Sequence, residues 1–215
     1  MADEMKNVSR LKEIISKFDR TKILVIGDLM LDEFIWGDVS RISPEAPVPV
    51  VHARRESFML GGALNVANNI HALGGRVLPC GVIGHDIRGQ SLMEELKAKG
   101  IGTEGIVVDK ERPTTLKTRI IARHQQVVRV DRETTEAIDH RVLGRILRFL
   151  REKISRVNLI LIEDYGKGAI VPQLLREVLK LVRQHKKPIT VDPKEDHFSY
   201  YRGVTVVTPD RKSVV

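Results

Sequence analysis

The sequence contains a single cysteine and no long apolar segment. One cysteine excludes an internal disulfide framework and is typical of proteins in a reducing cytoplasm. Cys80 stands in the apolar run 77–83, so we expect a buried thiol that packs against its neighbours. Purely aliphatic stretches such as 159–162 are far too short to cross a bilayer, and the polar start shows no signal-peptide pattern. We therefore expect a cytoplasmic protein with no membrane-bound segment.

Aromatic residues are also scarce, at 4%, while the formal net charge is +8. This charge permits an anionic partner, either a nucleic acid or a phosphorylated small molecule. No aromatic residue interleaves with a basic stretch, which disfavours base stacking. Arg141, Arg145 and Arg148 recur at helical spacing opposite apolar positions, as on a solvated helix face. We expect a small phosphorylated ligand rather than a nucleic acid.

Apolar runs alternate with helical patterns along most of the chain. Residues 22–27 form a continuous apolar run ending in glycine, which is typical of a buried parallel strand. Further strands are expected at 76–84, 105–108, 158–162, 189–191 and 204–207. Helices are expected at 3–19, 63–73, 88–99, 140–154 and 172–185. This order predicts an α/β fold with a doubly wound, mostly parallel sheet flanked by helices.

Two stretches break this rhythm. Three prolines among β-formers at 43–53 suit an exposed or edge strand. Residues 114–123 and 126–131 resemble a β-hairpin with one half-exposed face. Together these stretches predict a small β-sheet that projects from the core. We expect one domain over 1–215, with its core at about 1–33, 59–112 and 133–215 and the projecting sheet at about 34–58 and 113–132.

Three motif classes are disfavoured by their context. Residues 100–105 match the dinucleotide pattern G-x-G-x-x-G, but they follow a helix and lead into a strand, the reverse of the required order. Gly100 is better interpreted as the cap of the preceding helix. Gly166 and Lys167 lack the upstream glycine of a P-loop. The seven histidines show no metal-ligand spacing, so no zinc site is expected and the ligands of any metal stay unassigned.

Two carboxylates, Asp28 and Asp32, come at or just past the end of the first predicted strand. In open α/β sheets this edge is where ligands bind. A carboxylate there can accept two hydrogen bonds from vicinal sugar hydroxyls. The alternative interpretation is that both aspartates form turns or cap helices.

Gly61 and Gly62 open the next predicted helix, and Asn65 follows one turn later. Two glycines let backbone N–H groups approach a ligand without interference from Cβ atoms. The Asn65 amide offers a donor and an acceptor, which suits hydroxyl recognition. The alternative is a tight helix entry with exposed asparagines.

Basic residues are concentrated on the predicted hairpin. Arg119 and Arg129 suit a phosphate group on a substrate, because guanidinium binds phosphate with two hydrogen bonds, and Lys117 lies beside them. A solvated strand face explains these residues equally well. Residues 163–168 and 192–194 each follow a buried strand, so parallel strands would bring them to the same sheet edge as Asp28 and Asp32.

These segments, in this order, resemble the ribokinase-like (PfkB) carbohydrate kinases over residues 22–209. The motif Gly-Gly-Ala-Leu-Asn-Val-Ala at 61–67, followed by Gly-Val-Ile-Gly-His-Asp at 81–86, is similar to the family's first signature. The heptose-7-phosphate kinases are the subgroup that the sequence resembles most. Motifs typical of that subgroup occur at 40–50, 125–131, 164–169 and 192–194.

The resemblance implies ATP- and Mg²⁺-dependent phosphorylation of D-glycero-D-manno-heptose 7-phosphate at its anomeric hydroxyl. The product feeds ADP-heptose and lipopolysaccharide core synthesis, and such kinases are often fused to an adenylyltransferase. The projecting sheet is implied to be a lid and the contact of a homodimer. We expect substrate binding by Asp32, Gly61, Gly62, Asn65, Lys117, Arg119 and Arg129. We expect the phosphate or nucleotide side at Asp164, Lys167, Asp192, Lys194 and Asp210.

Two departures from the family pattern concern catalysis. The family's catalytic aspartate lies in a G-A-G-D motif that this sequence does not contain. The family motif T-P-N-x-x-E, whose glutamate helps to organise magnesium, reads T-P-D-R-K-S here, with Asp210 and Ser213 at the changed positions. A general base contributes roughly 10²–10⁴-fold to a rate, so we expect an incomplete and inactive chain. The alternatives are another ribokinase- or fructokinase-type enzyme and a non-catalytic sugar-phosphate-binding module.

Overall fold

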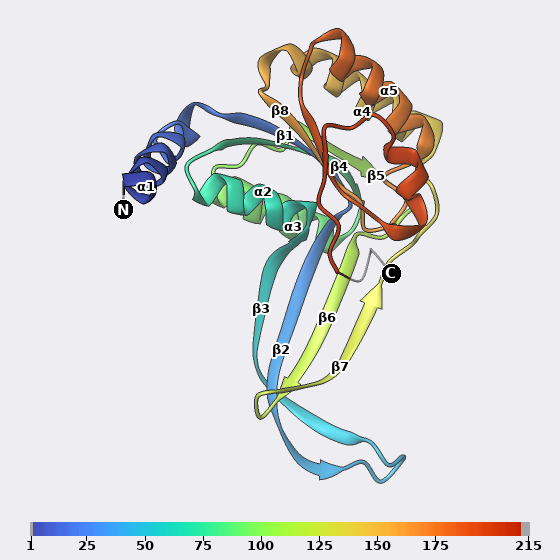
Figure 1. The fold of residues 1–215 in the computed structure, drawn as a ribbon. Helices are drawn as coiled ribbons and strands as arrows, with labels where there is room; N and C mark the ends of the chain where they lie inside the picture. The colour runs from blue at the N-terminus through green and yellow to red at the C-terminus, as the bar shows by residue number, and fades with distance from the viewer. Residues whose placement is uncertain (1, 212–215) are drawn as a thin grey trace.

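The computed structural model describes residues 2–211, with side chains from Asn7 onward; Ser213 lies outside the described residues. A six-stranded sheet forms the core, in the order β10-β9-β8-β1-β4-β5 (Figure 1). Every neighbouring pair in it is parallel. Its strands are β1 (Lys22–Gly27), β4 (Arg76–Gly84), β5 (Gly105–Asp109), β8 (Leu159–Glu163), β9 (Ile189–Asp192) and β10 (Val206–Val207). The doubly wound fold is confirmed.

Helices cover both faces of this sheet. α2 (Ala63–Ala72) and α3 (Ile87–Ala98) lie on one face, and α4 (His140–Lys153) and α5 (Pro172–Gln184) lie on the other (Figure 1). Along β1, Leu24 and Ile26 pack with α4 and α5, whereas Val25 between them packs with α2 and α3. A strand buried on both faces needs apolar residues at every position, which explains why β1 is a continuous apolar run.

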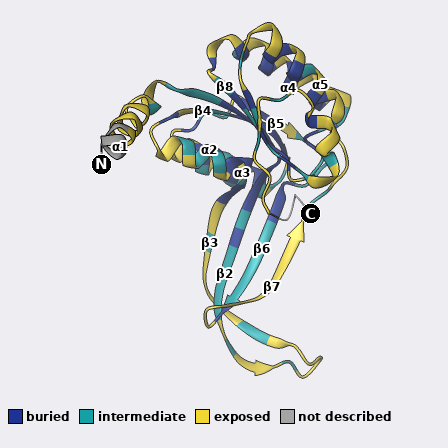
Figure 2. Cartoon of the chain, viewed as in Figure 1, coloured by how far each residue is buried: buried dark blue, intermediate teal, exposed yellow. Residues whose placement is uncertain are grey.

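The second sheet projects from the core and is built from four strands in the order β3-β2-β6-β7 (Figure 1). These strands are β2 (Leu29–Ile42), β3 (Pro49–Gly62), β6 (Thr115–Ala122) and β7 (Gln125–Arg132). β6 and β7 form the predicted hairpin, whose two-residue turn has positive φ at Arg123 and His124. β3 is an edge strand, as the prolines indicated. Burial declines from the core to the outer end of the sheet (Figure 2).

β2 is the strand that the sequence analysis did not predict. The chain leaves β1, passes through Asp28 and enters β2 at once, so Asp32 lies within a strand of the projecting sheet. Asp32 thus comes shortly after the end of β1, as expected, but it lies in a strand rather than in a loop. Two consecutive carboxylates, Asp32 and Glu33, interrupt the apolar pattern, and Glu33 is nevertheless buried against Thr118 and Arg88.

The N-terminal helix ends earlier than predicted. α1 (Ala2–Ile15) is followed by a 3₁₀ turn, η1 (Phe18–Arg20), rather than continuing to residue 19. α1 extends away from the body of the molecule, and its apolar residues Leu11 and Ile15 are exposed (Figures 1 and 2). Two further short 3₁₀ segments are η2 (Ile154–Arg156) and η3 (Glu195–Tyr201).

Several local predictions agree with the structure. Gly100 follows α3 with φ +72°, as a helix-capping glycine does. Cys80 is fully buried, and burial raises the pKa of its thiol to about 12. Arg145 and Arg148 are exposed on α4, opposite buried Ile146. Within residues 2–211, no helix has the length and apolarity needed to span a membrane.

Candidate functional site

Asp28 fixes the loop between β8 and α5. Its Oδ2 accepts the N–H groups of Tyr165 at 2.8 Å and Lys167 at 3.1 Å, and its Oδ1 accepts that of Ala169 at 3.1 Å. Burial raises the pKa of Asp28, although these three hydrogen bonds act in the opposite direction. Asp28 is 2% exposed, and its carboxylate neither forms a local turn nor caps a helix but holds a loop that is distant in the sequence.

Asp32 and the two glycines meet where β2 and β3 reach the core. Met30 and Gly61 are register partners, so Asp32 lies diagonally across from Gly61. A Cβ atom on Gly61 would fall 2.5 Å from Asp32 Oδ2. Gly62 has φ +53° and would place a Cβ atom 2.5 Å from the Asp28 carbonyl. Both positions therefore require glycine.

A polar pocket of about 360 Å³ opens beside this junction. It is lined by Asp32, Phe58, Met59, Leu60, Asn65, Asn68, Glu95 and Lys99. Asn65 and Asn68 lie three residues apart on α2 and so share one face of the helix. Asp32 and Asn65 therefore line one pocket, whereas Gly61 lies beside Asp32 and Gly62 lies against the Asp28 carbonyl without lining it. Asn68 was not singled out in the sequence, although its i+3 spacing from Asn65 is a usable signal.

The three basic residues expected to bind substrate, Lys117, Arg119 and Arg129, are each paired with a carboxylate. Arg119 Nη1 donates to Asp32 Oδ1 at 2.5 Å, which leaves Oδ2 on the side of Gly61. Lys117 Nζ lies 3.1 Å from Asp131 Oδ2, and Arg129 Nε lies 2.9 Å from Asp131 Oδ1. Burial works to raise the pKa of Asp131, but the hydrogen bonds from Lys117 and Arg129 hold it below its ordinary value. Any ligand of these cations has to compete with protein carboxylates.

A second group of carboxyls lies at the carboxyl ends of β8 and β9. Glu163 and Asp192 are register partners on adjacent parallel strands, so their side chains lie on the same face of the sheet. Burial and the charge of Asp192 raise the pKa of Glu163 to about 8. Burial and then Asp210 raise the pKa of Asp192. The sequence placed Glu163 at this sheet edge, but Glu163 was not among the expected site residues.

Tyr165 connects this group with the polar pocket. Burial raises the pKa of its hydroxyl to about 12, and the charges of Glu163, Asp192, Asp32 and Asp28 act in the same direction. These carboxyls therefore lie within electrostatic reach of one side chain. The sheet edge thus gathers carboxyl groups close to Asp32, which lines the polar pocket.

Asp164 points to the opposite face from Glu163, because successive side chains of a strand alternate. Its Oδ1 accepts the N–H of Gly166 at 2.9 Å. Its Oδ2 accepts the Tyr201 hydroxyl at 2.7 Å and lies 2.8 Å from His197 Nδ1. Both oxygens of this buried carboxylate are thus used to hold the β8–α5 loop against η3.

A larger cavity, of about 480 Å³, lies between this loop and η3. It is lined by Thr135, Ala137, Tyr165, Gly166, Lys167, Gly168, Ile170, Val171, Pro172, Lys194, Asp196, His197 and Tyr200. The five residues expected on the phosphate or nucleotide side are thus not gathered in one place. Lys167 and Lys194 line this cavity, and Asp164 holds its loop against η3. Asp192 lies beside Glu163, and the charge of Asp210 acts on Asp192. His197 was not predicted, and nothing in its sequence neighbourhood indicates its position.

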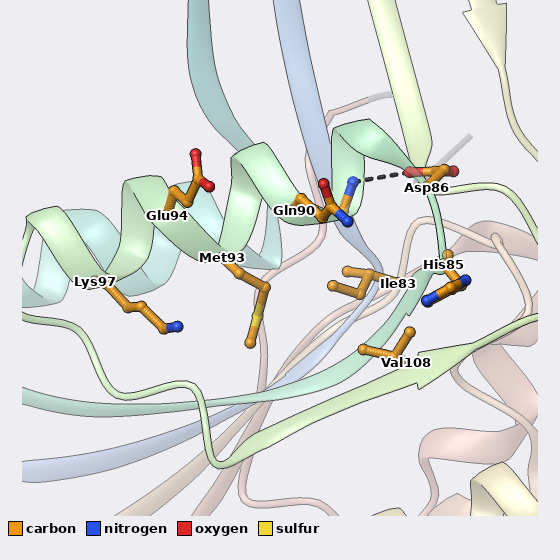
Figure 3. A pocket seen from close by; sticks show the side chains of 10 residues that line it. Ile83, His85, Asp86, Gln90, Met93, Glu94, Lys97 and Val108 are labelled. Atoms are coloured by element: carbon orange, nitrogen blue, oxygen red, sulfur yellow. Dashed lines mark hydrogen bonds between the residues drawn. The ribbon is translucent and has the colours of Figure 1, made fainter.

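A third pocket, of about 210 Å³, lies between α3 and β5, and Met93, Ile83 and Val108 point toward it (Figure 3). None of the candidate residues lines it. Asp86 at its rim caps α3 by accepting the Gly89 N–H at 2.8 Å (Figure 3). Among residues 2–211, no group of three or more His, Cys, Asp or Glu side chains is arranged to hold a metal ion.

Comparison with known proteins agrees with this architecture. The model of the pfkB family carbohydrate kinases matches residues 20–212. The chain is 49% identical over 189 residues to the bifunctional protein HldE of Geobacter metallireducens, covering 88% of this chain and 39% of that protein. It is 46% identical over 190 residues to HldE of Helicobacter pylori, covering 88% of this chain and 41% of that protein. The chain thus spans about two fifths of these relatives.

The fold is also found in solved structures. A ribokinase of Arabidopsis thaliana, in complex with ribose and ATP, superposes with a TM-score of 0.63 and is 14% identical, over 90% of this chain and 61% of that one. The family match covers most of the sequence, including both sheets and the Gly-Gly entry to α2. The chain belongs to the pfkB family of carbohydrate kinases.

Proposed function

We propose that this chain is the sugar-binding part of a kinase that phosphorylates D-glycero-D-manno-heptose 7-phosphate at its anomeric hydroxyl, giving the 1,7-bisphosphate. The kinase family and the HldE relatives support this substrate class. The observation that carries the proposal is the pocket lined by Asp32 and Asn65, with Gly61 directly beside Asp32 Oδ2.

The chemistry of this pocket suits a polyol. Asp32 Oδ2 lies beside a residue without a side chain, so a sugar hydroxyl can approach it and donate a hydrogen bond. Asn65 and Asn68 can each donate to one hydroxyl and accept from another. Arg119 keeps Asp32 oriented through the other oxygen. The residues of this chain would therefore bind and orient the sugar.

The same proposal includes ATP and Mg²⁺, and the carboxyls near Glu163 fit such a group. Mg²⁺ binds through one or two carboxylates together with phosphates and water. Burial first, and then a neighbouring carboxyl, raise the pKa values of Glu163 and Asp192, and a bound cation would favour the charged forms of both groups. Asp192 and Asp210 would offer oxygen ligands, and bound Mg²⁺ would neutralise the phosphates during transfer.

We further propose a homodimer formed through the projecting sheet and a cytoplasmic location. Val128 and Val130 on β7 are 45% and 54% exposed, and Ile42 at the end of β2 is 60% exposed. Such apolar exposure on a sheet favours association. Sedimentation at several concentrations tests the dimer, and a monomer at all of them would contradict it. The buried free thiol of Cys80 is consistent with a reducing compartment.

The experiment is a calorimetric titration of the chain with heptose 7-phosphate. Asp32→Asn should weaken binding by about tenfold or more, because a hydrogen bond to a charged group contributes about 1.5–3 kcal/mol. The matched control is Asp38→Asn, which removes the same charge from an exposed pair with Arg54 on the projecting sheet. Equal affinities for Asp32→Asn and Asp38→Asn would refute the assignment of the pocket.

A panel of sugars in the same titration separates the alternatives. Tighter binding of ribose or a fructose phosphate would indicate a different sugar kinase of this family. The 215 residues contain no Gly-Ala-Gly-Asp, so we propose that the chain binds its sugar without turnover. Phosphorylation of heptose 7-phosphate by this chain would contradict that part of the proposal.

A further inference from the structure

A row of side chains with alternating charge runs from the projecting sheet to the core. Arg129 on β7 lies 2.9 Å from Asp131, and Asp131 lies 3.1 Å from Lys117 on β6. Lys117 lies 3.3 Å from Glu133 Oε2, and the other oxygen of Glu133 lies 2.5 Å from Lys167 Nζ in the β8–α5 loop. This row contains three cations and two carboxylates, so it has a surplus of positive charge.

Glu133 joins the two ends of this row, because it contacts Lys117 of the projecting sheet and Lys167 of the core. It follows β7 directly, in the segment that returns to α4. On the core side, the Lys167 N–H donates to Asp28 at 3.1 Å and the Lys167 carbonyl accepts from Arg112 at 3.3 Å. Burial works to raise the pKa of Glu133, but Lys167 and Lys117 hold it below its ordinary value. A charged carboxylate thus ties the return segment to a fixed point of the core.

The cavity of about 480 Å³ offers Lys167 a different partner. Lys194 and His197 line it together with Lys167. Lys194 is 42% exposed and pairs only loosely with Asp196, at 3.6 Å. His197 is oriented by Asp164, whose Oδ2 lies 2.8 Å from Nδ1. A phosphate group carries about −1.5 to −2 charge and three strong acceptor oxygens, which matches two ammonium groups beside an imidazole.

We propose that a phosphate group bound in this cavity competes with Glu133 for Lys167, so that filling the cavity releases the return segment of the projecting sheet from the core. The proposal rests on the proposed function only for the nature of the ligand, a phosphorylated sugar or a nucleotide. The competition is expected because Lys167 both lines the cavity and forms the ion pair with Glu133. Glu133 is therefore a positioning residue that ligand binding displaces.

The test is a calorimetric titration of the chain with inorganic phosphate. Glu133→Gln should bind phosphate about fivefold more tightly than the wild type, because the competing carboxylate is lost from a mostly buried pair. The matched control is Glu177→Gln, which removes the same charge from a pair with Lys180 on α5. Equal affinity of these two variants would overturn the proposal, because the gain would then come from net charge alone.

A second variant separates competition from a merely structural role. Lys167→Gln breaks the same tie but should weaken phosphate binding by about fivefold, the opposite sign to Glu133→Gln. Hydrogen exchange of residues 133–138 should rise in both variants, and it should rise in the wild type only when phosphate is added. Shifts of phosphate affinity in the same direction in both variants, or hydrogen exchange unaffected by phosphate, would refute the competition between phosphate and Glu133.

The source of the phosphate is settled by two further titrations. A sugar phosphate is compared with its unphosphorylated sugar, and ADP is compared with adenosine, each on the wild type and Glu133→Gln. The ligand whose affinity rises in Glu133→Gln is the one that uses the cavity. If Glu133→Gln raises the affinity for inorganic phosphate but heptose 7-phosphate does not bind, the competition stands while the proposed substrate fails. If heptose 7-phosphate binds but Glu133→Gln leaves the affinity for inorganic phosphate unchanged, only the competition is refuted.

Discussion

Replacing Asp28 by asparagine separates loop fixing from ligand binding at the edge of the core sheet. In the wild type Oδ2 accepts two backbone N–H groups, from Tyr165 and Lys167, and Oδ1 accepts a third, from Ala169. Asparagine keeps one oxygen, so at least one of these positions receives an NH₂ group that faces buried donors. A buried group left without its partner costs about 1–3 kcal/mol.

The net loss of stability is smaller than the cost summed over two buried donors that lose their acceptor. Burial raises the pKa of Asp28, so the wild type also bears the cost of desolvating a charge, which asparagine removes. We therefore expect Asp28→Asn to lower the free energy of unfolding by about 2–3 kcal/mol, out of the ~5–15 kcal/mol typical of a domain.

Urea unfolding followed by circular dichroism measures this loss. With an m-value of about 2 kcal/mol/M, the midpoint should fall by about 1 M at unchanged slope. Asp38→Asn serves as the control, because an exposed ion pair contributes only about 0–1 kcal/mol. A midpoint for Asp28→Asn within about 0.2 M of that control would refute the role given to the three hydrogen bonds.

Two further predictions concern the pocket and the buried carboxyl. Gly61→Ala should weaken sugar binding by about tenfold, because its Cβ would fall 2.5 Å from Asp32 Oδ2, whereas Gly144→Ala on α4 meets no atom within 4 Å and should leave affinity unchanged; calorimetry that finds the two alike contradicts the close approach. Glu163, with a folded pKa of about 8, binds more protons in the folded than in the unfolded state between about pH 4.5 and 8, so wild-type stability should fall as pH rises through this range. Glu163→Gln should flatten the decline in urea titrations, and an unchanged slope would contradict the raised pKa.

The strands and helices of the core were predicted well, because their apolar residues follow the patterns expected of buried strands and of helices with one buried face. β1 and β4 were predicted with their observed bounds, since strands covered on both faces are continuously apolar. α4 was predicted from its spacing, and its exposed arginines lie opposite its buried residues. β2 was missed because Asp32 and Glu33 break its pattern, and only the packing of β3, β6 and α3 around it explains how a strand carries them.

The candidate site was predictable as a set of positions but not as a geometry. Asp28 and Asp32 have the same kind of neighbourhood in the sequence, yet one fixes a loop and the other lines a pocket. Glu163 and Asp164 are adjacent, yet they face opposite sides of the sheet. The Glu133–Lys167 pair joins residues 34 positions apart, a separation at which periodicity carries no information.

The most direct test of the central claim is a crystal structure of the chain soaked with heptose 7-phosphate. We predict sugar density in the pocket lined by Asp32 and Asn65, with a hydroxyl within hydrogen-bond distance of Asp32 Oδ2 on the side of Gly61. Sugar density elsewhere on the chain, with this pocket filled only by solvent, would contradict it.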